Sequence, residues 1–592
     1  MPHRAPDPAL TASDAFVTSL PDMTVARLLL KYLELEGATK LFGIPGGALI
    51  FLIDELRDQR DRFDFYICRH ETGAAYIAHG YARVSGELGV VLTTAGPAAT
   101  NALTGTMNAQ ASNCSVLHIS GEVPREYFGQ GYLQEGIDAK LDVSAIYRNA
   151  VQSSAVVSSE KNFATLFRQA LRDARSQPPR AAHISLPNDV AGTCVRGVTM
   201  PRSPANYRAT PESTDQARVS ATFAELAGAE RPLIFLGNGA RQALEDEHRL
   251  RRFTAMVEKF AIPVMTTPDA KGVFPESHAV SLRNYGMTAC AWPDLYIGDP
   301  RDPDHYSKNL IPRNHFVQVD LDQSVIGRDF PITRGIVADA GATLDALCDA
   351  AAGHEPDPTR KSARIALLDE IKRTSPFADP VGRASDSAPL HPAALVREMN
   401  EVLERGHVVI DAGNCVGWSL NNLVVDPPLR YHSALDMGPM GFAVGAVIGG
   451  KIAAPDEPCV ALVGDGAFMM HGAEISTAAQ NGVGAVWVVL YDDDLSMVSQ
   501  GMAELFPPPG PWHDYYKLGA PDLVKFSEGL GAQAVAVQRD QGPAAFRQAL
   551  QTAVSRADAS RRPQVVVAHI DTGPMPPYGW PHLKKPDCSA PT

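Results

Sequence analysis

The sequence lacks paired cysteines, long apolar runs and an excess of positive charge. Its eight cysteines include no C-x-x-C pair, which argues against a zinc site or a disulfide framework and favours reduced thiols in the cytoplasm. No segment approaches the roughly 18 consecutive apolar residues that a membrane helix needs. Lys and Arg number 53 against 67 Asp and Glu, a formal net charge of −14, so we expect no binding to nucleic acid or to membranes.

The rest of the composition is that of an ordinary globular protein. With 45% hydrophobic and 20% charged residues, the chain can bury large cores. Its 592 residues suggest three or four domains, at about 150 residues each. Residues 1–22 contain several prolines and no uninterrupted apolar stretch, which predicts a flexible N-terminal tail and not a signal peptide.

Short apolar runs alternate with helical spacing along most of the chain. Residues 89–96 (GVVLTTAG) and 486–490 (VWVVL) are strand-sized, whereas residues 25–37 (VARLLLKYLELEG) repeat their apolar side chains at helical intervals. Continuous apolar strands between helices are typical of parallel sheets that are covered on both faces. We therefore predict an α/β fold with three doubly wound parallel-sheet domains.

Polar and proline-containing stretches divide the chain into blocks. The segment at about 196–215 is predicted to be a first linker. Residues 285–312 carry prolines and charges with little periodicity, where a doubly wound domain would continue with a helix and a strand. The predicted boundaries are α/β domains at 23–195, 205–352 and 389–575, a linker at 353–388 and a C-terminal tail at 576–592.

The most informative stretch lies between residues 460 and 497. One predicted strand ends in Gly464-Asp465-Gly466, and the next ends in Tyr491-Asp492-Asp493-Asp494. Because neighbouring parallel strands end at the same sheet edge, Asp465 and Asp492 can converge on one cation, and the following helix can offer N–H groups to phosphate. Few, hard oxygen ligands suit Mg²⁺. The alternative is an ordinary strand-end turn.

With 24 residues between Gly466 and Tyr491, this pattern resembles the fingerprint of thiamine-diphosphate enzymes, in which a Gly-Asp-Gly turn is followed at a similar interval by an Asn pair. Here Tyr491-Asp492 replaces that pair, and Asp492 stands at the metal-binding position. The resemblance implies thiamine diphosphate held through Mg²⁺, with the main-chain oxygen of Asp494 as a third metal ligand. The implied cofactor and metal residues in this stretch are Gly464, Asp465, Gly466, Ala467, Asp492 and Asp494.

Two further segments are similar to the acetohydroxyacid-synthase-like branch of that family. Residues 67–83 (ICRHETGAAYIAHGYAR) match its N-terminal, pyrimidine-binding domain. The resemblance implies that Glu71 contacts N1′ of the aminopyrimidine ring and shares a proton with it, which activates the coenzyme. The alternative is that Glu71 only caps a helix. His70 is a candidate catalytic residue, and a histidine at this position or at His471 could shuttle protons in the active site; the alternative for both is a structural role.

Other residues match family positions around the cofactor. Met440 matches the bulky residue that holds the two coenzyme rings in a V, with ordinary core packing as the alternative. Gly413, Asn414 and Cys415 match a turn that contacts the diphosphate. Gln134 matches a glutamine near the reacting carbon, although Leu133 stands where a Phe is usual.

Departures from the family limit the substrate assignment. Gln152 falls where acetohydroxyacid synthases tend to have Lys, and Gly501 falls where they have a Trp that shapes the acceptor pocket. These changes disfavour branched-chain biosynthesis. The central domain lacks the expected flavin-side turn, so we expect a vestigial domain and doubt that it binds FAD.

The resemblance implies an enzyme that decarboxylates a pyruvate-like 2-oxo acid and transfers the acyl carbanion to a carbonyl acceptor. It also implies a homodimer or homotetramer, in which Glu71 of one chain reaches the cofactor of another. Simple decarboxylases and diketone-cleaving lyases share the same apparatus and stay as alternatives, as does a flavin-dependent oxidase. A non-catalytic cofactor-binding subunit is the alternative from another functional class.

Overall fold

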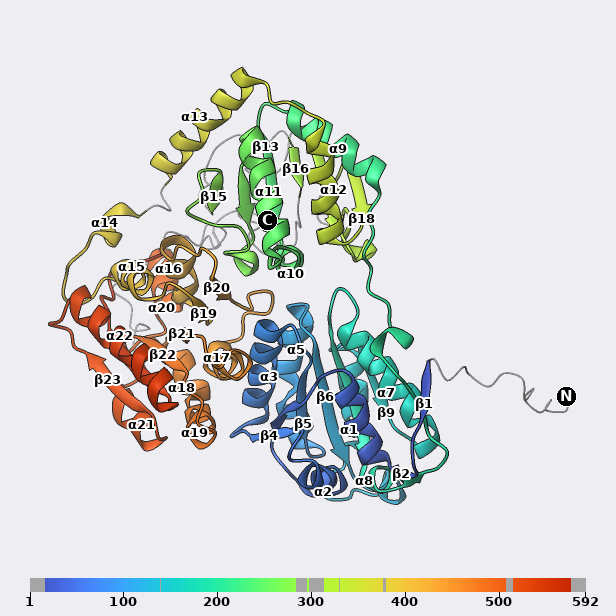
Figure 1. Ribbon diagram of the computed structural model, residues 1–592. Coiled ribbons are helices and arrows are strands. Elements are labelled where there is room, and N and C mark those ends of the chain that lie inside the picture. Colours follow the sequence, from blue (N-terminus) through green and yellow to red (C-terminus); the bar gives the residue numbers. More distant parts are fainter. Residues whose placement is uncertain are drawn as a thin grey trace, which may run out of the picture. The chain divides into compact units, whose positions relative to one another are not determined.

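The computed structural model describes residues 16–138, 140–283, 295–297, 314–328, 331–375, 379–506 and 515–576. The chain divides into two compact units, Met1–Thr210 and Pro211–Thr592. The first unit holds one six-stranded sheet and the second holds two (Figure 1). Strands within each of these three sheets are parallel. The predicted fold class of three parallel α/β sheets is therefore confirmed.

The sheet of the first unit has the strand order β4-β3-β5-β6-β10-β9. Its strands are β3 (Lys40–Gly43), β4 (Asp64–Ile67), β5 (Gly89–Thr93), β6 (Val116–Glu122), β9 (Ser153–Val156) and β10 (Ala181–Pro187). Its helices are α1 (Val25–Leu35), α2 (Ile50–Asp58), α3 (Glu71–Ser85), α4 (Pro97–Asn101), α5 (Leu103–Ala111), α6 (Val143–Arg148), α7 (Glu160–Arg175) and α8 (Asn188–Ala191).

The central sheet of the second unit has the order β15-β14-β13-β16-β17-β18. Its strands are β13 (Pro232–Leu236), β14 (Val264–Thr266), β15 (Ser281–Arg283), β16 (Leu295–Ile297), β17 (His315–Asp320) and β18 (Arg334–Val337). The accompanying helices are α9 (Gln216–Gly228), α10 (Arg241–Leu244), α11 (Glu247–Phe260), α12 (Ala340–Ala352) and α13 (Pro358–Thr374).

The C-terminal sheet of that unit has the order β20-β19-β21-β22-β24-β23. Its strands are β19 (Gly406–Ile410), β20 (Leu429–His432), β21 (Cys459–Gly464), β22 (Val486–Tyr491), β23 (Gln533–Val537) and β24 (Gln564–His569). Its helices are α14 (Pro380–Arg383), α15 (Pro392–Val402), α16 (Asn414–Asn422), α17 (Phe442–Ala453), α18 (Asp465–His471), α19 (Ile475–Gln480), α20 (Ser496–Leu505), α21 (Leu523–Gly529) and α22 (Pro543–Ser560).

Burial explains why these segments take these conformations. Every residue of β5 and of β22 is buried, as expected for strands with helices over both faces. Helix α7 buries Phe163, Phe167, Ala170, Leu171 and Ala174, which recur at helical spacing and form one apolar stripe toward the core. Within the described residues no helix is long and apolar enough to cross a membrane.

Two predicted connecting segments are more ordered than the sequence analysis expected. The first part of the predicted tail, residues 1–15, lies outside the described residues, but Val17–Ser19 forms strand β1 and pairs with β12 (Thr199–Pro201). The predicted linker 353–388 contains the 17-residue helix α13. Leu368 and Ile371 of this helix join the central core, so their helical spacing, which we overlooked, gives the segment its structure. The linker prediction was wrong here.

The expectation that the interval 285–312 interrupts the regular structure of the central domain also needs a correction. Residues 295–297 form strand β16, which lies between β13 and β17 and completes the central sheet. The three-residue strand is too short for its periodicity to show in the sequence. The other residues of this interval, Cys290 among them, lie outside the described part of the chain, as do Cys588 and the predicted tail from residue 577 on.

A pair of buried histidines lies inside the first sheet. His118 and His183 are opposite each other on β6 and β10 and are fully buried. Thr93 Oγ1 lies 2.8 Å from His118 Nε2, and Ser120 Oγ and Ser154 Oγ lie 2.9 and 2.8 Å from the two ring nitrogens of His183. Burial lowers the pKa of His118 to about 3 and holds the pKa of His183 well below its ordinary value.

We expect these histidines to make the protein sensitive to acid. Their folded-state pKa values lie below the unfolded value of about 6.5, so the unfolded chain binds more protons below that pH and stability is lost as pH falls. At pH 5 the buried His118 should cost about 2 kcal/mol of folding stability, and His183 should add to this loss in the same direction. The thermal midpoint of wild type should therefore fall more between pH 7 and pH 5 than that of His183→Asn. Equal losses in the two proteins would contradict the prediction.

Candidate active site

The buried carboxylate of Asp465 ties two strand ends of the C-terminal sheet together. Asp465 follows β21 and is 2% exposed. Its Oδ2 atom accepts hydrogen bonds from the backbone N–H groups of Asp492 (3.2 Å) and Asp493 (2.7 Å), which follow the neighbouring strand β22. Its Oδ1 atom accepts from Gly466 N–H at 2.8 Å. The predicted convergence of the two strand ends is thus present, although Gly466 N–H serves Asp465 and not an external group.

Asp492 adds a second buried carboxylate at this edge. It is 9% exposed, and its Oδ2 atom accepts a short hydrogen bond from Ser496 Oγ at the start of α20. Burial, together with the charge of Asp492, raises the pKa of Asp465 to about 7. Burial also raises the pKa of Asp492 to about 6, against the hydrogen bond from Ser496. Both groups are therefore costly to ionise until a cation compensates their charge.

Asp494 lies at the end of the same turn. Its Oδ2 atom accepts from Ser499 Oγ (3.1 Å) and Lys517 Nζ (2.9 Å), and the backbones of Asp494 and Lys517 form an isolated bridge. Its Oδ1 atom is buried and makes no hydrogen bond in the described structure. Lys517 therefore supplies positive charge to a turn in which three aspartates stand in sequence.

This donor set fits a hard divalent cation. Carboxylates of Asp465 and Asp492, the backbone of the 492–494 turn and the unpaired Oδ1 of Asp494 are all oxygen donors, which Mg²⁺ prefers. Among the described residues, no group of three or more His, Cys, Asp or Glu side chains surrounds one point. A cation here would need further ligands from outside the protein, such as phosphate oxygens and water.

Asp411 organises the neighbouring turns and was missed in the sequence analysis. It follows β19 and is fully buried. Its carboxylate accepts from the N–H groups of Gly441 and Ala443 (both 2.8 Å) and of Ala412 (2.9 Å). Burial raises its pKa to about 7, against these hydrogen bonds. The signal was present in the sequence, because Asp411-Ala412-Gly413 follows a strand just as Gly464-Asp465-Gly466 does.

Met440 and His471 lie near the Gly-Asp-Gly turn. Met440 is half-buried, and its Cε atom is 3.6 Å from the place where a Cβ on Gly466 would stand. The ring of His471 packs on Gly441, whose φ of +88° places the turn in the left-handed region. A Cβ at Gly441 would come within 2.3 Å of that ring, so the turn requires glycine.

The predicted diphosphate turn forms the start of α16. Gly413 is the N-cap, with φ +108° and ψ −164°, a conformation that only glycine adopts readily. Asn414 Nδ2 donates to Gln500 Oε1 at 2.9 Å. The thiol of Cys415 instead points inward and donates to Asp411 O at 2.9 Å, and burial raises its pKa. The Cys415 side chain is therefore directed into the domain, whereas Gly413 and Asn414 form the turn itself.

Glu71 is the first residue of α3 in the other unit and is 8% exposed. Its Oε2 atom accepts from Asn101 Nδ2 at 3.0 Å. The exposed His70 caps this helix, since its Nδ1 atom accepts from Thr72 N–H at 3.2 Å. The sequence analysis missed Asn101, which fixes the direction of the Glu71 carboxylate.

Gln134 lies in a loop of the same unit. Its φ is +60° and its side chain is exposed, as is that of Leu133. A Cβ on Gly96 would stand 2.6 Å from the carbonyl oxygen of Gln134, so the loop approaches the turn before α4 closely. The carboxylate of Glu135 holds the loop by accepting N–H hydrogen bonds from Gly131 (2.9 Å) and Tyr132 (3.1 Å).

These features define a class: an α/β enzyme built from three parallel-sheet domains, with carboxylates at the strand ends. Comparison with known families makes the class specific. The chain matches the N-terminal TPP binding domain of thiamine pyrophosphate enzymes at residues 23–142, their central domain at 219–347 and their C-terminal TPP binding domain at 411–568.

Full-length relatives agree with the domain matches. The chain is 30% identical over 592 residues to IlvB2 of Mycobacterium tuberculosis, a large subunit of the acetolactate synthase type, covering 95% of this chain and 99% of the relative. It is 29% identical to the acetolactate synthase large subunit IlvB1 of the same species over 88% of this chain and 85% of the relative. It is 27% identical to the mitochondrial acetolactate synthase catalytic subunit of Aspergillus candidus, covering 92% and 80%.

The chain belongs to the thiamine pyrophosphate enzyme family and resembles its acetolactate synthase members over nearly its whole length.

Replacing Asp411 with Asn should weaken binding of Mg²⁺ and thiamine diphosphate about tenfold. The Asn amide keeps one acceptor oxygen but turns an NH₂ group toward a backbone N–H, which displaces the Gly441 turn. Isothermal titration measures the affinity. Asp522→Asn is the matched control, because Asp522 also accepts a backbone N–H, at the exposed N-cap of α21. Equal affinities of Asp411→Asn and wild type would show that the turn does not depend on Asp411.

Two substitutions of Asp492 test separately whether the site needs its negative charge or only its oxygen ligand. We expect Asp492→Asn to keep Mg²⁺-dependent cofactor binding within a few-fold, because an amide oxygen can still coordinate the cation. Asp492→Ala should lose tenfold or more, because no ligand replaces the oxygen. The same titrations at fixed Mg²⁺ measure both variants, and binding by Asp492→Ala at wild-type affinity would remove Asp492 from the metal site.

Proposed function

We propose that this protein is a thiamine-diphosphate- and Mg²⁺-dependent carboligase that decarboxylates a 2-oxo acid and joins the resulting acyl unit to a carbonyl acceptor. The observation that carries the proposal is the hydrogen bonding of Asp465 to the backbone of Asp492 and Asp493, which brings the two residues at the family's metal-binding positions, Asp465 and Asp492, to one edge of the sheet. Similarity to acetolactate synthases over 95% of the chain supports the same activity. When bound, thiamine diphosphate supplies the carbon nucleophile for the attack on the 2-oxo acid.

The side chains divide this work. Asp465, Asp492 and the main-chain oxygen of Asp494 would hold the cation, while Gly413 and Asn414 would contact the diphosphate. Met440 would support the coenzyme rings. Glu71 would hold a proton at N1′ of the aminopyrimidine, with Asn101 fixing its orientation. We propose a homodimer or homotetramer in which Glu71 comes from the partner chain.

A simple decarboxylase or diketone-cleaving lyase is the second candidate. It is favoured by Gly501, which lies buried in α20 and has no side chain to shape an acceptor pocket, and by Gln152 in place of the family Lys. These enzymes differ from a carboligase only in the acceptor. The vestigial, flavin-free central domain and the cytoplasmic location remain predictions, and a purified protein that is yellow from bound flavin would contradict the former.

Glu71→Gln should lower the rate of CO₂ release from the best 2-oxo acid about 10²- to 10³-fold, because the amide cannot exchange a proton with N1′. The assay screens pyruvate and larger 2-oxo acids, with and without an added aldehyde. A ligation product identifies the carboligase, and a free aldehyde identifies the decarboxylase.

Glu160→Gln is the matched control. Glu160 is also the first residue of a helix, α7, in the same unit, so this change removes the same helix-terminal charge away from the predicted site. Undiminished turnover in Glu71→Gln would refute the proposed role. A wild-type protein that binds no Mg²⁺ and thiamine diphosphate would refute the enzyme itself and favour a non-catalytic subunit.

A further inference from the structure

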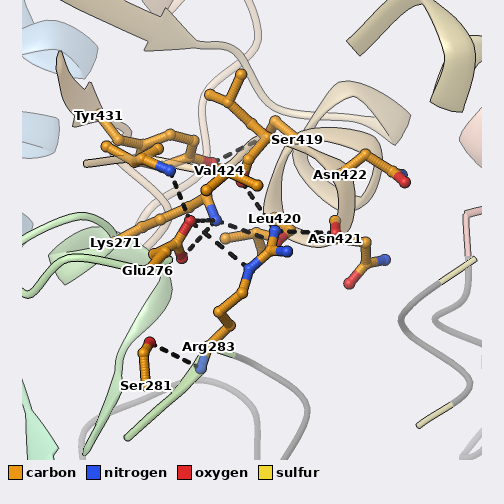
Figure 2. A network of polar contacts seen from close by, with 12 residues as sticks. Lys271, Glu276, Ser281, Arg283, Ser419, Leu420, Asn421, Asn422, Val424 and Tyr431 are labelled. Carbon is orange, nitrogen blue, oxygen red and sulfur yellow. Dashed lines mark hydrogen bonds and ion pairs between the residues drawn. The ribbon is translucent and has the colours of Figure 1, made fainter. Parts of the chain in front are cut away.

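Three cationic side chains donate hydrogen bonds to the carbonyl groups at the C-terminal end of helix α16. The last four carbonyl groups of a helix have no partner within the helix. Here Leu420 O accepts from Lys271 Nζ at 3.2 Å, and Asn421 O and Leu423 O accept from the Arg283 guanidinium at 3.1 and 2.9 Å. Asn422 O accepts from Arg383 at 2.8 Å. Two of these cations belong to the central domain, and Figure 2 shows both beside α16.

A buried carboxylate joins the two central-domain cations. Glu276 accepts from Lys271 Nζ at 2.6 and 2.7 Å, and its Oε2 atom lies 3.7 Å from Arg283 Nε. All three side chains are less than a tenth exposed. We call these residues the Lys271–Glu276–Arg283 network.

The network also holds the chain that leaves α16. Glu276 Oε2 accepts from Val425 N–H at 2.9 Å, and the backbone N–H of Glu276 donates to Val425 O at 3.3 Å. Gly272, with φ +80°, packs so closely that a Cβ would come within 2.3 Å of Val425. The central domain therefore contacts both the last turn of α16 and the residues that follow it through hydrogen bonds and close packing.

The opposite end of the same helix is the turn at Gly413 and Asn414. Nine residues span about 13 Å in an α-helix, and α16 is packed through the buried Trp418, whose ring contacts His391. Cations at the C-terminus of a helix and an anion at its N-terminus both act favourably on the helix dipole. A short, well-packed helix transmits any displacement of one end to the other.

Stability alone explains this arrangement poorly. Removing a Lys and a Glu from water costs about as much as their attraction returns, and apolar residues of similar volume often stabilise as well. A buried ion pair is better suited to fixing one geometry, because each misplacement leaves a charge without its partner.

We propose that Lys271, Glu276 and Arg283 are positioning residues for the cofactor site: they hold α16 from its C-terminal end and so fix the Gly413–Asn414 turn where it contacts the diphosphate. This inference rests on the proposed function for the identity of the ligand. It also gives the central domain a role without a ligand of its own.

Two variants test the network. Arg283→Met removes the donor to Asn421 and Leu423. The double change Lys271→Met with Glu276→Gln removes one positive and one negative buried charge together and keeps an amide oxygen for Val425 N–H, while Arg283 keeps the carbonyl groups of Asn421 and Leu423. We expect each to weaken binding of Mg²⁺ and thiamine diphosphate about tenfold, with kcat at saturating cofactor within about twofold. Deuterium exchange in residues 413–418 of the cofactor-free protein should also become faster.

Arg364→Met is the matched control. Arg364 is a buried cation that caps the carbonyls of Phe260 and Ala227 inside the central domain, so its loss should lower the thermal midpoint without changing exchange at 413–418 or cofactor affinity. Wild-type affinity and exchange in both network variants would overturn the proposal, as would an equal effect of Arg364→Met. If one network variant does not fold, the other decides.

The exchange measurement separates this inference from the proposed function. It uses the cofactor-free protein, so faster exchange at 413–418 supports the hold on α16 even if wild type binds no thiamine diphosphate. In that case the proposed function fails, and the network would position a turn for another ligand. Unchanged exchange beside normal cofactor binding would leave the proposed function standing and remove the network from it.

Discussion

The hydrogen bonds from the 492–493 backbone to Asp465 Oδ2 are the interaction on which the candidate site depends. They fix the relative height of two adjacent strand ends and place a second carboxylate, Asp492, beside the first. Parallel pairing of β21 with β22 makes this possible, because it brings residues 27 positions apart to one edge of the sheet. Without this tie the turn after β22 would be free to point its aspartates into water. The pairing register of β21 and β22 therefore determines which side chains meet at the candidate site, and the chemistry of those side chains depends on it.

Sequence reasoning found the parts of the site that carry their own pattern. Gly-Asp-Gly after an apolar run, and a second acidic cluster after the next run, point to Asp465 and Asp492 because neighbouring parallel strands end at the same edge of a sheet. The same reasoning located the three sheets, since fully buried strands read as continuous apolar runs.

The missed features have a common physical cause. Asp411, Asn101 and Lys517 contact groups that are distant in sequence, so their partners cannot be read from the local sequence, even where a strand-end pattern marks the residue itself, as it does for Asp411. Helix α13 was missed for a different reason: only one face of it is buried, and its charged residues made the segment resemble a linker. Cys415 was assigned to the diphosphate turn only because it stands at a matching family position. In the structure its thiol points toward Asp411 O, and sequence alone does not give the direction of a side chain.

All three sheets place charged residues just beyond the carboxyl ends of their strands. Glu71 follows β4, Asp465 and Asp492 follow β21 and β22, and in the central sheet Lys271 follows β14 while Arg283 ends β15. This edge is where α/β sheets usually bind ligands. In the central domain, however, Lys271 and Arg283 are engaged with α16 and with Glu276. At Lys271 and Arg283 this edge of the central sheet meets a protein helix, so the central domain contributes charged groups to the neighbouring domain of the same unit.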